Sequence, residues 1–140
     1  MTLPILLGLG SLAFGLSMAS VVGGMAKTPE GPRRYPRKVF HLGIFVGAVP
    51  ALLLGDFWGV GIYGLVISLI VLGAVLQGPG LPFYAALARK EVGRDSHRSI
   101  LVPLVSTAIG GLASVLLVGR FAAVGFLVCG LGDAAGEPAG

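Results

Sequence analysis

The chain has 140 residues and a formal net charge of +4, with 55% hydrophobic and only 11% charged residues. A water-soluble domain carries charged side chains at about a quarter of its positions, so this chain has too few to cover a water-facing surface. The mean hydropathy of +0.94 also excludes an intrinsically disordered chain. The single cysteine, Cys129, excludes a disulfide within the chain. The composition therefore indicates a protein whose solvent is the lipid bilayer.

Five apolar segments follow one another, over residues 3–26, 39–55, 57–76, 100–118 and from 121 onward. The hydrocarbon core of a bilayer is about 30 Å thick and is crossed by roughly 20 helical residues. We therefore expect an all-α, polytopic membrane protein with about five transmembrane helices, forming a single domain over residues 1–140. Pro50 is expected to bend the second helix. Residues 81–88 are expected to form a short helix in the membrane interface.

The basic residues indicate how the chain is oriented. Nine of the ten Lys and Arg residues lie in the connectors 27–38 and 77–99. The positive-inside rule therefore predicts that these connectors are cytoplasmic and that the N-terminus is outside. No basic residue precedes the first apolar segment, which favours an uncleaved helix over a signal peptide. We expect a multi-pass protein of a prokaryotic inner or plasma membrane.

The last eleven residues contain two carboxylates, Asp133 and Glu137, inside or beside a membrane segment. Acidic side chains are costly there and are usually functional. Their spacing of four places them on one helix face, where both can bind one divalent cation. Glycines recur at positions 132, 136 and 140, so a phosphate or another backbone can come close. The alternative is a helix-packing glycine stripe with its acids at the helix end.

Two basic motifs precede that segment. Arg37 and Lys38 lie one helical turn before His41, and His97 stands next to Arg98 just before the fourth apolar segment. Arg and Lys bind phosphate, and His donates or accepts a proton. The alternative interpretation is that both motifs only anchor helices at the membrane surface.

The predicted topology places both basic motifs and both acids on one side of the membrane. Phosphate donors, carboxylates for a divalent cation and glycines for close approach are the components of a phosphoryl- or nucleotidyl-transfer site. No basic surface interleaved with aromatic residues is present, so nucleic acid is not an expected partner. Residues 59–64, Gly-Val-Gly-Ile-Tyr-Gly, match a dinucleotide-binding fingerprint, but no strand precedes them, so we interpret these glycines as helix packing.

These motifs carry a resemblance to a known family. The Arg37-Lys38-x-x-His41 element, with Gly132-Asp133-Ala134-Ala135-Gly136-x-x-x-Gly140, resembles the CTP-dependent polyprenol kinases. That family includes dolichol kinase and phytol kinase and is related to phosphatidate cytidylyltransferase. The resemblance implies a multi-helix membrane enzyme that transfers the γ-phosphate of CTP to a lipid alcohol with Mg²⁺.

The resemblance also implies roles for individual residues. Asp133 would hold the metal and the nucleotide phosphates, and Gly132, Gly136 and Gly140 would line the nucleotide loop. The family usually has alanine at the position of Gly136, and its members continue with further spans. We therefore expect this chain to be the N-terminal part of a longer family domain.

Three hypotheses follow. The first is a prenol kinase in which Arg37, Lys38 and Arg98 contact phosphates. In that kinase, Asp133 and Glu137 bind the metal. His41 and His97 act as hydrogen-bond donors or in proton transfer. The second is a phosphatidate cytidylyltransferase, and the third is a non-enzymatic small transporter or helix-packing subunit. The residues determine neither the acceptor lipid nor the oligomeric state, although the glycine stripes permit pairing into a homo-oligomer.

Overall fold

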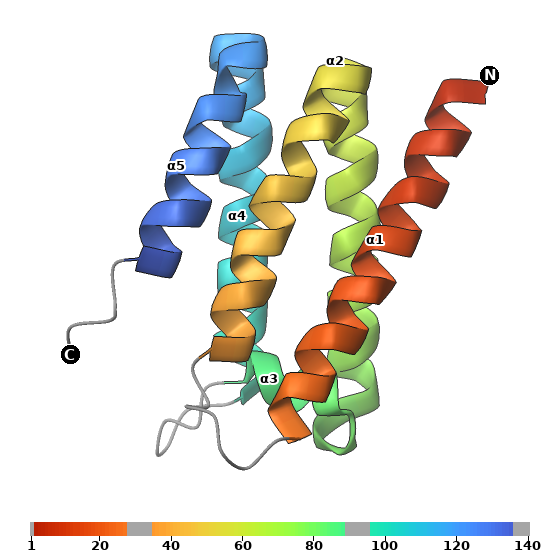
Figure 1. Cartoon of the computed structure of the whole chain (residues 1–140), viewed down its shortest axis with the longest axis vertical. Coiled ribbons are helices and arrows are strands. Elements are labelled where there is room, and N and C mark those ends of the chain that lie inside the picture. The colour runs from red at the N-terminus through yellow and green to blue at the C-terminus, as the bar shows by residue number, and fades with distance from the viewer. Residues whose placement is uncertain (1, 28–34, 89–95, 136–140) are drawn as a thin grey trace.

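The computed structural model describes residues 2–27, 35–88 and 96–135, and Figure 1 shows how they are arranged. Within these ranges the chain is helical, without strands, which confirms the predicted all-α class. The elements in chain order are α1 (Thr2–Lys27), α2 (Tyr35–Gln77), the 3-10 turn η1 (Gly78–Gly80), α3 (Pro82–Leu87), α4 (Ser96–Val118), the 3-10 turn η2 (Gly119–Phe121) and α5 (Ala122–Ala135).

Three helical stretches of the described chain are long and apolar enough to cross a membrane, namely Thr2–Lys27, Tyr35–Gly80 and His97–Gly132. Large apolar side chains cover their outer faces, with Leu76 80% exposed and Leu117 83% exposed. A protein in water rarely presents such extensive apolar surface. The length and composition of the helices therefore support the predicted membrane location.

Helix α2 consists of two antiparallel arms joined at Asp56. Asp56 has φ 50° and ψ −139°, angles outside any helix, so residues 57–77 run back beside residues 35–55 (Figure 1). Asp is among the residues that tolerate a positive φ more readily than most. The reversal falls between the second and third predicted apolar segments. Pro50 lies within the first arm without interrupting its helical backbone angles.

Small residues let the two arms approach closely. A Cβ at Gly59 would collide with the carbonyl oxygen of Ala51, so only glycine fits there. Gly47 likewise leaves room for Tyr63, whose hydroxyl donates a hydrogen bond of 3.0 Å to the carbonyl oxygen of Ile44. The hairpin is thus held by backbone contact and by one hydrogen bond across the arms.

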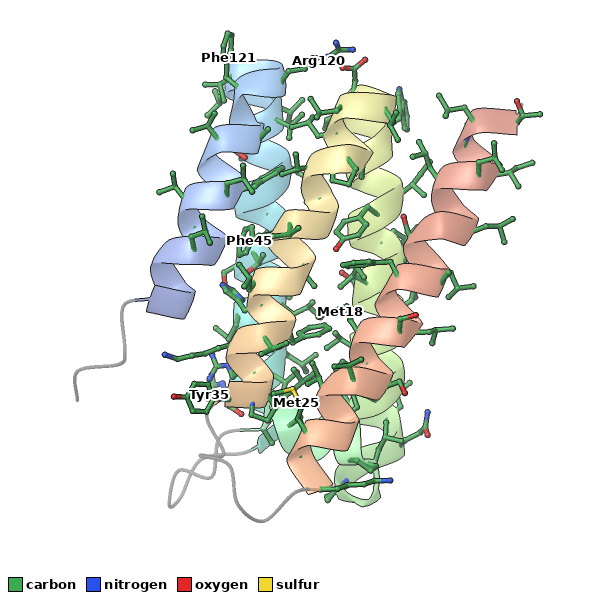
Figure 2. The ribbon with its side chains drawn as sticks, viewed as in Figure 1. Met18, Met25, Tyr35, Phe45, Arg120 and Phe121 are labelled. Atoms are coloured by element: carbon green, nitrogen blue, oxygen red, sulfur yellow. The ribbon has the colours of Figure 1, made fainter. Side chains whose placement is uncertain are left out.

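Helix α1 packs along the hairpin. Gly15 faces the side chains of Ile67 and Ile70, and Met18 projects from α1 toward Gly43 of α2 (Figure 2). Val22 of α1 is fully buried and belongs to the same hydrophobic cluster as residues of both arms of α2. These contacts join α1 and both arms of α2 into one core.

The short helix expected over residues 81–88 is present as α3, but it packs into the protein. Phe83, Tyr84, Ala86 and Leu87 are all buried. The ring of Phe83 meets that of Phe40 edge to face, with centroids 5.1 Å apart. Its apolar side chains therefore cover a protein surface, and the position of this helix at the membrane interface stays a prediction.

The bundle has two distinct ends. The start of α2, all of α3 and the start of α4 lie at one end, which we call the basic end because it carries Arg37, Lys38 and Arg98 (Figure 1). The opposite end holds the Asp56 reversal and η2 (Figure 2). There the guanidinium of Arg120 donates to both carboxylate oxygens of Asp56, at 2.6 and 3.2 Å. This ion pair joins the turn of α2 to the turn between α4 and α5.

Candidate functional site

A cavity of about 340 Å³ lies between the two arms of α2, helix α4 and helix α5. Its volume is within the usual range of about 300–1,000 Å³ for small-molecule sites. From Arg37 to Ala48 it extends along the first arm of α2 for about 16 Å, at 1.5 Å of rise per residue. The cavity is therefore elongated parallel to the helices.

The polar groups of this cavity gather at its basic end, which we call the mouth. Arg37 and His41 are one turn apart on α2, and Ser99 is in the first turn of α4. The imidazole of His41 packs edge to face on the ring of Phe45, with centroids 4.8 Å apart. That contact orients the ring at the cavity wall. The mouth thus combines a guanidinium, an imidazole and a hydroxyl, the donors that a phosphate or a lipid hydroxyl needs.

The rest of the cavity is nearly all apolar. Only Ser68 and Thr107 add hydroxyls along its length. Beyond its far end the core is closed by the buried side chains of Leu52, Val115 and Ala122, which do not line the cavity. The cavity therefore runs from a cationic mouth into an apolar interior, the polarity pattern of an amphiphile with a small polar head.

The structure brings some of the predicted phosphate-binding residues to this cavity and leaves others outside it. Arg37 and His41 line it, as described above. Lys38, His97 and Arg98 lie at the same end of the bundle but not in the cavity wall. The imidazole of His97 is exposed and rests against the ring of Tyr84, with centroids 5.5 Å apart. These three residues therefore lie at the basic end without lining the mouth.

The predicted acidic motif is described only in part. Gly130 of α5 packs against Leu42 and Phe45 of α2, and the backbone of Asp133 follows one turn later along α5, toward the basic end. The side chain of Asp133 lies outside the described part of the chain, as do all of Gly136, Glu137 and Gly140. Gly132 is exposed, and a Cβ there would meet nothing within 4 Å.

The binding of Mg²⁺ by the carboxylates of Asp133 and Glu137 therefore stays a prediction. Among the described residues, no group of three or more His, Cys, Asp or Glu side chains lies close enough to hold a metal ion. The proposed donors, Asp133 and Glu137, fall outside that search. Carboxylate oxygens are nevertheless the ligands that Mg²⁺ prefers.

Several cavity residues had no functional prediction from the sequence. Ser68, Ser99 and Thr107 line the cavity but are not among the predicted site residues. Gly61 and Gly64, interpreted as packing glycines, lie in the cavity wall instead of a helix contact. They differ from Gly59 in the direction that each glycine faces. That direction depends on the tertiary arrangement of the helices and cannot be read from the sequence.

Comparison with known proteins adds no relative. No family model, curated protein or solved structure matches this chain.

Proposed function

We propose that the chain is a membrane lipid-alcohol kinase, which transfers the γ-phosphate of CTP to a prenol with Mg²⁺. The observation that carries the proposal is the cavity that joins Arg37 and His41 to an apolar interior. In this proposal the helices cross the membrane five times, because each arm of α2 has about the 20 residues that a crossing needs. The N-terminus is outside, and the basic end faces the cytoplasm, where nucleotides are found.

The polarity of the cavity explains how such an acceptor would be selected. An alkyl tail that leaves the bilayer for an apolar cavity exchanges one apolar environment for another, so its transfer contributes little free energy. Selection must therefore come from the head and from the shape of the cavity. A hydroxyl at the mouth can bond to His41, and a phosphate there is stabilised by the guanidinium of Arg37.

The chemistry proposed at the mouth is an in-line phosphoryl transfer. The acceptor oxygen forms a bond to the γ-phosphorus, the bond from that phosphorus to the β–γ bridging oxygen breaks, and CDP leaves. The hydroxyl proton passes to an imidazole, with His41 the closer candidate because it lines the cavity and His97 the alternative. Arg37, Lys38 and Arg98 neutralise charge on the transferred phosphoryl group.

The metal and nucleotide residues come from the family resemblance and the chemistry of the side chains. Asp133 and Glu137 would hold Mg²⁺, and Gly132, Gly136 and Gly140 would let the nucleotide phosphates approach the backbone. Bound Mg²⁺ would neutralise negative charge on those phosphates. The register of α5, with Gly130 against Leu42 and Phe45, directs the Asp133 turn toward the His41 end of α2.

Labelled CTP distinguishes this proposal from its rivals. The chain is reconstituted in liposomes with Mg²⁺, a panel of prenols and phosphatidate, and CTP labelled at either the α- or the γ-phosphate. A kinase transfers only the γ-label to lipid, whereas a cytidylyltransferase transfers only the α-label. Lipid labelled by neither nucleotide would contradict both and favour a non-enzymatic membrane subunit or transporter.

A further inference from the structure

The glycines of the described helices differ in what surrounds them. At Gly47, Gly59 and Gly130 a Cβ would meet atoms of a neighbouring segment, so these glycines serve close packing. At Gly61 and Gly64 a Cβ would meet nothing within 4 Å, although both face the cavity. Small residues between membrane helices normally bring the backbones into contact. Here they leave open space between the second arm of α2 and α4.

Small residues of α4 border the same space. Gly111 lines the cavity, and a Cβ there would meet only the ring of Phe126, at 3.9 Å. Its neighbour Gly110 is exposed, and a Cβ there would meet nothing within 4 Å. Neither helix therefore fills the gap from its own side.

The gap reaches the outer surface of the bundle. Leu65 lines the cavity and is 61% exposed. At the depth of Leu65, the cavity is therefore open toward the outer side of the bundle, between α2 and α4. Closer to the mouth, by contrast, the cavity wall is made by the buried side chains of Ile67, Val71 and Ile100. The cavity is thus open at the glycine-lined level, away from the cationic mouth.

We propose that this gap, bounded by Gly61, Gly64, Leu65 and Gly111, is a lateral portal that admits the apolar tail of a lipid alcohol from the bilayer. The proposal rests on the proposed function for the identity of its occupant. Charge complementarity assigns the orientation: the hydroxyl, or the phosphate formed from it, lies at Arg37 and His41, and the tail passes outward between α2 and α4. A tail longer than the cavity then continues into the lipid, so chain length does not limit binding.

The portal is tested with a photoreactive prenol that carries a diazirine near the tail end, bound to the chain in phosphatidylcholine nanodiscs. Gly64→Phe and, separately, Gly61→Leu place side chains into the open space. The matched control is Gly73→Phe, on the same arm, where a Cβ also meets nothing within 4 Å but the residue does not line the cavity. An unchanged thermal midpoint shows that each variant folds.

The wild type and the Gly73 variant should be labelled on the peptides that contain Leu65 and Gly111. The two portal variants should be labelled about tenfold less, equivalent to about 1.4 kcal/mol of binding free energy at 25 °C. Short and long prenols should compete for labelling alike. Equal labelling of folded wild type and both portal variants would overturn the portal.

The same experiment distinguishes failure of the portal proposal from failure of the proposed kinase activity. If the wild type is labelled at these peptides but forms no lipid phosphate from CTP, the portal stands and the proposed kinase activity fails. If lipid phosphate forms but the label lies on other peptides, the kinase stands and the portal fails.

Discussion

Asp56 shows how one residue can combine backbone geometry with charge. Its positive φ reverses α2, and its carboxylate accepts two hydrogen bonds from Arg120. The hydrogen bond from Arg120 lowers the pKa of Asp56 below its ordinary value of 3.8. Because the folded-state pKa is the lower one, the pair stabilises the fold above that ordinary value and loses its effect as the pH falls below it.

We expect Asp56→Asn to lower the thermal midpoint at pH 7, because asparagine tolerates the backbone angles but cannot form the ion pair. The difference in thermal midpoint between wild type and variant should narrow as the pH falls below 3.8. The wild-type carboxylate then becomes protonated and, like asparagine, carries no charge. Thermal unfolding in detergent across this range checks the prediction. A difference that does not change with pH would show that the ion pair is not its cause.

At the scale of elements, the packing of the α2 arms depends on Gly59. Gly59→Ala should destabilise the protein by about 1–3 kcal/mol, the usual cost of overpacking, because its Cβ would collide with a backbone oxygen that cannot rotate away.

Gly73→Ala, on the same arm, provides the control. It should stabilise the protein by up to about 1 kcal/mol, because a Cβ there meets nothing within 4 Å and alanine is the better helix former. Thermal midpoints of the two variants should therefore shift in opposite directions. Equal shifts would contradict the assigned packing of the two arms.

The helices were largely predictable from the sequence, whereas the cavity was not. Apolar runs and the polar break at Asp56 predict where helices lie, because lipid permits few other backbone structures. Gly59, Gly61 and Gly64 share one residue type and one helix, yet one packs on Ala51 and two line the cavity. Likewise, the apolar residues of α3 predict a short helix, but they do not reveal that its side chains are buried against α1 and α2. These differences depend on tertiary neighbours, which a helical pattern does not contain.

For the whole molecule, the two ends of the bundle should lie on opposite sides of the membrane. Gln77 is exposed at the basic end, and Trp58 is 76% exposed beside the Asp56 turn. In a Cys129→Ser background, a membrane-impermeant maleimide should label Gln77→Cys only in inside-out vesicles and Trp58→Cys only in right-side-out vesicles. Labelling of both from the same side would contradict the five-crossing arrangement. The reverse pattern would contradict the proposed orientation.

The measurement that tests the central claim most directly is the initial rate of γ-label transfer from CTP to a prenol. It compares the wild type with Arg37→Ala, His41→Gln and a matched control, Lys27→Ala, whose basic side chain lies at the end of α1 outside the cavity wall. We expect His41→Gln to lower the rate by about 10²–10⁴-fold, the usual contribution of a general base, and Arg37→Ala to lower it as well, while Lys27→Ala leaves it near the wild-type value. Wild-type rates in both cavity variants, or no label in lipid from any of the four proteins, would contradict the assignment of the cationic mouth as the site of phosphoryl transfer.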